Sequence, residues 1–202
     1  MSTPGTNPTT IRTVVKLGGG SLADPAGFDR ACRVLGTCRR SGMLVVPGGG
    51  ALADAVRDLD RRFGLSDGAA HRMAILAMDQ LAEMIAERLG ADGVVVESLP
   101  GILRAIAEGR VPVLAPSRWL ADVDPLPHSW SVTGDSIAAW VAGACGARRL
   151  VLIKPAGAGS RAVDDWFDRA IPPSVAWSVI GLDQVEEYFP AILSGPVTSP
   201  GE

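Results

Sequence analysis

Two apolar segments of this chain run straight into clusters of glycine, and this arrangement limits the fold more than any other feature. The first segment reads TVVK and continues into LGGGS, while the second reads LVV and continues into PGGG. A helical spacing of apolar residues follows each glycine cluster, over 25–40 and 51–63. A strand, a glycine turn and a helix in succession are typical of an α/β protein with a parallel sheet.

The rest of the chain continues this alternation. Besides 11–17 and 43–46, we expect strands at 94–97, 111–115, 149–153 and 177–180, and further helices at 67–89, 102–108, 136–145, 164–169 and 183–192. The strands are apolar throughout, which indicates a sheet that helices cover on both faces. The sequence therefore predicts one α/β domain over 11–202, a three-layer αβα sandwich with a mostly parallel sheet, after a frayed tail at 1–10.

Composition excludes several classes of function. The net charge of −3 leaves no basic footprint, so we expect no nucleic-acid partner. No apolar run approaches the roughly 20 residues of a membrane span, and no signal core is present, so we expect a cytoplasmic protein without a membrane partner. The three cysteines lack metal-ligand spacing, which indicates reduced thiols and predicts no metal bound by protein side chains.

Lysine is rare and is placed unusually. Only two of the nineteen basic residues are lysines: Lys16 ends the first strand, and Lys154 ends LVLIK. Lysine is a compact point charge, whereas arginine is a planar fork. A lysine beside a glycine turn at a strand end is suited to a transferring phosphoryl group, because glycine lets backbone N–H groups approach phosphate closely. The alternative is that both lysines are simply solvated.

The segment TGDS is the third candidate element. Thr133 or Asp135 can cap the helix that we expect from Ser136, the commonest role of these residue types. Alternatively, Asp135 lies at the same sheet edge and orients Lys16 and Lys154, since a carboxylate between two ammonium groups keeps both charged. The glycine turns match neither the Walker A loop, in which lysine follows the glycines, nor the dinucleotide fingerprint.

Taken together, these segments resemble a known family. VVKLGGGSL, VVPGGGALADAVR, SVTGDSIAAW and LVLIK occur in the order found in the amino acid kinase superfamily, over 11 to about 195. SDGAAHRMAILAMDQLAEMIAERL further resembles the small kinases of methanofuran biosynthesis, whose acceptor is [5-(aminomethyl)furan-3-yl]methyl phosphate. The resemblance implies an αβα sandwich that uses ATP and Mg²⁺ to phosphorylate a small phosphate acceptor. We also expect a homodimer.

The resemblance implies a role for each motif. Lys16 would bridge the transferring phosphoryl group, Asp135 would organise the two lysines, and Lys154 would approach the ATP phosphates. The first glycine turn would hold the ATP phosphates, at Gly18, Gly19, Gly20 and Ser21. The second would hold the acceptor phosphate through the backbone N–H groups of Gly48, Gly49 and Gly50.

The long helix at 67–89 supplies candidates for the acceptor pocket. We expect Arg57 or Arg72 near the acceptor phosphate and Asp79 near its amine, while Trp130 can stack on a ring. The apolar neighbours of Asp79 equally indicate a buried core or a dimer face. His128 is expected to be a solvated loop residue.

Two departures from the family pattern leave other functions open. PAGAGSRAVDDW follows Lys154 where many relatives have a VDG-type turn, which implies a shortened nucleotide lobe. Ser131 and Gly134 replace an acidic and a hydroxyl residue of the subgroup. Two alternatives therefore remain. The kinase could use another acceptor, a carboxylate or isopentenyl phosphate, or the protein could be a non-catalytic nucleotide- or anion-binding member of the same fold.

Overall fold

The core of the protein is one parallel β-sheet. The structure, a computed structural model, describes residues 10–194, so residues 1–9 of the tail predicted at 1–10 and residues 195–202 of the predicted domain lie outside the described residues. Within them, six strands pair in parallel in the order β3-β4-β2-β1-β5-β6. Their bounds are β1 Thr13–Leu17, β2 Met43–Pro47, β3 Gly93–Val96, β4 Val111–Leu114, β5 Arg149–Lys154 and β6 Ala176–Gly181. Every predicted strand is confirmed.

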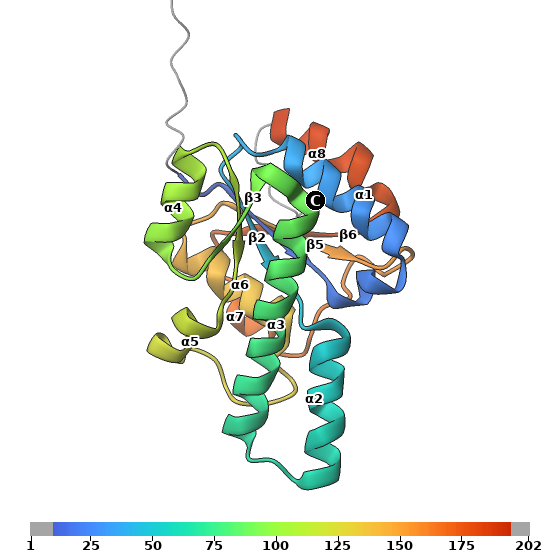
Figure 1. Cartoon of the computed structure of the whole chain (residues 1–202), viewed down its shortest axis with the longest axis vertical. Coiled ribbons are helices and arrows are strands. Elements are labelled where there is room, and N and C mark those ends of the chain that lie inside the picture. The colour runs from blue at the N-terminus through green and yellow to red at the C-terminus, as the bar shows by residue number, and fades with distance from the viewer. Residues whose placement is uncertain (1–9, 195–202) are drawn as a thin grey trace, which may run out of the picture.

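Helices connect the strands (Figure 1). The α-helices are α1 Pro25–Thr37, α2 Gly50–Phe63, α3 Asp67–Leu89, α4 Leu99–Ala107, α5 Ser117–Val123, α6 Gly134–Ala144, α7 Phe167–Ala170 and α8 Val185–Ser194. Three short 3₁₀ turns, η1 Gly19–Ala23, η2 Gly90–Asp92 and η3 Leu182–Gln184, adjoin them. Within residues 10–194, no helix combines the length and the apolar character that a membrane span needs.

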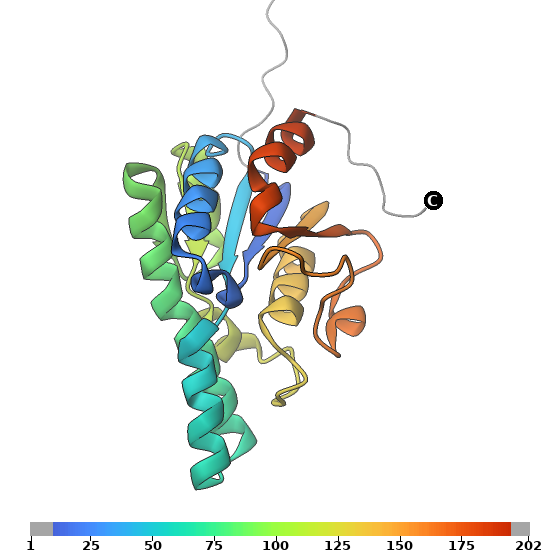
Figure 2. The ribbon, with the colours of Figure 1, turned by 90° about the vertical axis from the view of Figure 1, so that its right-hand side faces the viewer.

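Successive strand residues point to opposite faces, and each face is covered by helices. Val14 packs into a core with α4 and α6, whereas Val15 packs into a second core with α1, α3 and α8. Figure 2 shows the sheet edge-on between these two layers. The predicted three-layer αβα sandwich is therefore confirmed.

Some local predictions differ from the structure. Ser66, rather than Asp67, caps α3, because its hydroxyl accepts the N–H of Ala69 at 3.3 Å. The helix α5 was not predicted at all. Its first N–H, from Ser117, donates to the carboxylate of Asp79 at 3.0 Å. The local sequence carries no signal for this cap, because its acceptor lies far away on α3.

The fold brings the candidate site residues to one edge of the sheet. The carboxyl ends of the neighbouring strands β1, β2 and β5 lie together there, and this is the edge at which parallel α/β sheets bind ligands. The paired helices α2 and α3 extend past this edge and form an arm beside it (Figure 1).

Candidate active site

The two glycine turns touch each other at the ends of β1 and β2. A Cβ atom built on Gly19 would lie 2.1 Å from the Cα of Gly50, and one built on Gly48 would lie 2.6 Å from the backbone N of Gly19. Gly50 also has a φ of +54°, in the left-handed region that favours glycine. The glycines are therefore needed to let two backbone turns meet at van der Waals distance.

Two of these glycines use their N–H groups within the fold. Gly18 donates to the backbone oxygen of Ile153 at 3.0 Å, and Gly48 donates to that of Leu17 at 2.9 Å. The expectation that these two N–H groups face phosphate is therefore corrected. Gly19 and Gly50, in contrast, begin η1 and α2, where an N–H has no partner within its own helix.

The structure brings Lys16, Asp135 and Lys154 together. One carboxylate oxygen of Asp135 lies 2.9 Å from the Nζ of Lys16, and the other lies 2.5 Å from the Nζ of Lys154. The lysines belong to adjacent strands, and Asp135 is in the first turn of α6. The side chain of Asp135 therefore bridges the lysines instead of capping the helix.

Burial and the neighbouring charges shift the pKa values of Lys16 and Asp135. Burial lowers the pKa of Lys16 from its ordinary value, although the charge of Asp135 opposes this change. Burial alone would raise the pKa of Asp135, but the two nearby ammonium groups outweigh it and hold that pKa below its usual range. Asp135 is therefore an ionised carboxylate that keeps positive charge at a site shielded from water.

The first turn of α6 is held by Asp164, which lies just before α7 and not within the helix predicted at 164–169. One carboxylate oxygen of Asp164 accepts three hydrogen bonds. The donors are the backbone N–H of Thr133 at 2.9 Å, the Thr133 hydroxyl at 2.7 Å and the backbone N–H of Ser136 at 3.0 Å. The Ser136 hydroxyl donates to the other oxygen. Because this capping carboxylate comes from a later part of the chain, no local cap motif could have revealed it.

A cavity of about 200 Å³ opens beside Lys16. Part of its lining comes from Lys16, the two glycine turns and the turn at Thr133 and Gly134. The rest of the lining combines apolar and polar side chains from the α2–α3 arm, the loop before α6 and α6 itself. These residues are Ala53, Asp54, Arg57, His71, Ala74, Ile75, Met78, Trp130, Val132 and Ile137.

The predicted acceptor residues are not all at this cavity. Arg57 lines it, but Arg72 lines a neighbouring cavity. Asp79 is not among the lining residues of either, and its carboxylate accepts the N–H of Ser117. The expectation that Asp79 meets the acceptor is therefore corrected. Asp54, which was not predicted, lines the cavity instead. It is one helical turn before Arg57, whose guanidinium lies 3.4 Å from its carboxylate.

Trp130 forms part of the cavity wall and is fixed in place. Its indole N–H donates to the carboxylate of Asp60 at 2.7 Å. The guanidinium of Arg57 lies 4.6 Å from the centre of its ring, within the range of a cation–π contact. These contacts hold the Trp130 ring at the cavity, and its stacking on a substrate ring stays a prediction.

Two further features bear on phosphate binding. The hydroxyl of Ser21 is buried and has no hydrogen-bond partner among the described residues, and such a group usually has one. A Cβ atom on Gly134 would lie 3.3 Å from both the Cα of Gly48 and the Cε of Lys16. Gly134 therefore lets α6 approach Lys16 closely, so this departure from the subgroup pattern is part of the packing of the site.

Comparison with known proteins agrees with this geometry. The chain is 27% identical over 186 residues to the [5-(aminomethyl)furan-3-yl]methyl phosphate kinase of Methanocaldococcus jannaschii, covering 89% of this chain and 82% of that protein.

Solved structures share the fold. The uridylate kinase of Archaeoglobus fulgidus superposes with a TM-score of 0.65 at 17% identity, covering 87% of this chain and 95% of that one. The UMP kinase of Bacillus anthracis superposes with a TM-score of 0.57 at 15% identity, covering 86% and 88%. The sequence profile of the amino acid kinase family matches residues 12–155, so this chain belongs to the amino acid kinase family and is a phosphotransferase.

Proposed function

We propose that this kinase transfers the γ-phosphoryl group of ATP to the phosphate of [5-(aminomethyl)furan-3-yl]methyl phosphate, giving the diphosphate. The observation that carries the proposal is a cavity lined by Lys16, which belongs to the Lys16–Asp135–Lys154 bridge, by apolar side chains and by the carboxylate of Asp54. The similarity to the archaeal kinase of that substrate supports the same acceptor.

Phosphoryl transfer of this type relies mainly on positioning and on neutralising charge. In the proposed reaction, Lys16 lies between the two phosphates and stabilises the charge that develops on the transferring group. Lys154 faces the ATP phosphates, and Asp135 keeps both ammonium groups in place. The N–H groups of Gly19 and Gly50 are then available to phosphate oxygens. A phosphate acceptor is already ionised, so the site needs no general base.

Mg²⁺ would reduce the charge on the ATP phosphates. Both oxygens of Asp135 already contact lysine, so we propose that the phosphates and water supply most of the ligands of Mg²⁺. The free hydroxyl of Ser21 fits a role as a donor to ATP phosphate.

The cavity favours a ring with an amine over the alternative acceptors. The ring would lie against Ile75, Met78 and Val132, with its phosphate toward Lys16 and its amine toward Asp54. Apart from its phosphate, isopentenyl phosphate has no polar group for Asp54, Arg57 and His71 to contact. These polar residues therefore favour an acceptor with a second polar end.

The test is acceptor-dependent release of ADP by the full chain with Mg-ATP. We expect turnover with the aminomethylfuran phosphate and none with isopentenyl phosphate or UMP. Turnover with UMP or isopentenyl phosphate, and none with the furan, would overturn the proposed acceptor while leaving the kinase assignment intact.

Substitution of Asp54 tests the orientation of the acceptor. We expect Asp54→Asn to raise the KM for the acceptor several-fold at unchanged kcat, because a partly exposed ion pair contributes up to about 1 kcal/mol. Asp58→Asn, an exposed position on the same helix that does not line the cavity, is the matched control. Equal KM values for the two variants would remove Asp54 from the proposal. The homodimer and the cytoplasmic location stay predictions.

A further inference from the structure

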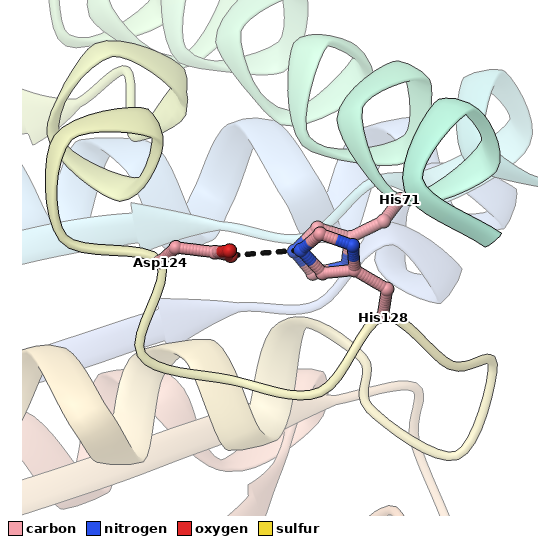
Figure 3. A group of neighbouring side chains, drawn as sticks. All are labelled: His71, Asp124 and His128. Atoms are coloured by element: carbon pink, nitrogen blue, oxygen red, sulfur yellow. Dashed lines mark hydrogen bonds and ion pairs between the residues drawn. The ribbon is translucent and has the colours of Figure 1, made fainter.

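The only two histidines of the chain lie against each other. His71 comes from the first half of α3, and His128 comes from the loop between α5 and α6. Their ring centres are 4.3 Å apart, and the ring planes differ by 20° (Figure 3). The fold thus brings two residues from distant parts of the sequence into direct contact. His71 also lines the cavity beside Lys16, whereas His128 does not.

A carboxylate completes this group. Asp124, at the carboxyl end of α5, places its Oδ1 atom 2.7 Å from the Nε2 of His128. One nitrogen from each histidine and one oxygen from Asp124 all lie within 4.8 Å of one another. Figure 3 shows the Asp124 side chain pointing toward the edge of the stacked rings. The three side chains therefore come together from three separate segments.

Two imidazoles and one carboxylate are a ligand set for divalent transition metals. Zn²⁺ is usually tetrahedral and binds histidine nitrogen and carboxylate oxygen at about 2.0–2.2 Å, so two ligand atoms on one ion lie roughly 3.3–3.6 Å apart. Binding therefore requires side-chain rotations that bring the three atoms, now within 4.8 Å of one another, into that range. We propose that His71, His128 and Asp124 bind one divalent transition-metal ion such as Zn²⁺, with water completing the coordination.

This ion would be distinct from the Mg²⁺ that accompanies ATP. Mg²⁺ prefers an all-oxygen environment, whereas imidazole nitrogen selects Zn²⁺, Co²⁺ or Ni²⁺. Arg72 and Arg118 line the adjoining cavity of about 400 Å³, and their positive charge opposes a cation. We therefore expect affinity in the micromolar range, weaker than that of a closed structural zinc site.

The consequence of binding would be an ordered acceptor cavity. The ion would tie the segment from Asp124 to His128 onto α3, and the residues just after that segment include Trp130 and Val132, which line the cavity. Bound metal should therefore protect the backbone amides of 124–133 from hydrogen exchange, even when no substrate is present.

The experiment uses the full chain without a histidine tag, nucleotide or acceptor, so its outcome does not depend on the proposed reaction. Co²⁺ is titrated as a spectroscopic probe, and Zn²⁺ binding is measured by calorimetry. We expect one site per chain, visible absorption bands of histidine-bound Co²⁺, and a higher Tm with Zn²⁺.

Variants locate the ion. His128→Ala and Asp124→Asn should each weaken Zn²⁺ binding at least tenfold, while Asp122→Asn, on the exposed side of α5, should bind as the parent does. Both test positions are at the surface of a loop or helix end, and circular dichroism checks their folding. The proposal is overturned if the parent binds neither ion at millimolar concentration, or if His128→Ala binds with unchanged affinity.

Discussion

The carboxylate of Asp164 accepts the backbone N–H of Thr133 at 2.9 Å, and it thereby holds the helix turn that carries Asp135. Removal of this carboxylate leaves the first N–H groups of α6 without their acceptor. We expect Asp164→Ala to destabilise the protein by about 1–2 kcal/mol, the upper range for loss of a helix cap.

The same substitution should lower kcat, whereas the KM for either substrate should change less. The reason is that Asp135 would no longer be held against the lysines. Asp165→Ala, an exposed neighbour, is the control for both thermal denaturation and steady-state kinetics. If the two variants had equal kcat and equal Tm, Asp164 would have no positioning role.

Lys16 should be required for turnover but not for folding. We expect Lys16→Ala to lower kcat by at least about 10²–10³, the usual cost of losing one donor that stabilises developing charge. Lys16→Arg should fail similarly, because a planar fork cannot occupy the place of the ammonium group beside Gly18 and Gly134. Single-turnover ADP release measures the effect, with Arg33→Ala on the exposed side of α1 as control. An active Lys16→Ala variant would disprove this role.

Turnover should decline early on the alkaline side. Burial lowers the pKa of Lys16, so this side chain loses its proton at a lower pH than an ordinary lysine of pKa about 10.4. We therefore expect kcat to fall with rising pH before pH 10.4, while the fold is retained. A pH profile of kcat, with circular dichroism at each pH, tests this. A kcat that stays constant until the protein unfolds would contradict it.

Acid should destabilise the protein through Asp135. The two ammonium groups hold the pKa of Asp135 below its unfolded value of about 3.9, so its contribution to stability is complete above that value. The contribution is lost as pH falls from about 3.9 through the lower pKa of the folded state.

Asp135→Asn should already be destabilised at neutral pH, because it leaves two lysines without their shared carboxylate, and should show less acid sensitivity over that window. Denaturant titrations at several pH values measure both effects. A parallel pH dependence of parent and variant would show that Asp135 is not the responsible group.

The contact of the glycine turns can be tested at Gly19. A Cβ atom there would meet the backbone of Gly50 at 2.1 Å, and neither backbone can yield without moving the other. We expect Gly19→Ala to cost about 1–3 kcal/mol of stability, as for other overpacked sites, and to abolish turnover. Gly159→Ala, where a Cβ meets nothing within 4 Å, should be neutral in the same denaturation assay. A fully stable and active Gly19→Ala would mean that the turns can separate freely.

The acceptor residues mark the limit of prediction from sequence. Arg57, Arg72 and Asp79 are charged residues that follow the second glycine turn in the sequence, but only Arg57 lines the cavity beside Lys16. The direction of each side chain depends on how α3 packs against the sheet and α5. Asp79 points to the N-terminus of α5, a short helix whose own sequence gave no clear signal.

Local patterns in the sequence specify the strands, the two glycine turns and the positions of Lys16 and Lys154 at strand ends. These features are encoded locally, by continuous apolar runs and by residues that permit close backbone approach, and the order of parallel α/β units brings strand ends to one edge. Three contacts, in contrast, arise only from the packing of the folded chain: Asp164 caps α6, Asp54 lines the cavity beside Lys16, and His71 stacks on His128. Each of these contacts joins separate segments, and their geometry depends on packing angles and side-chain directions that no local pattern specifies.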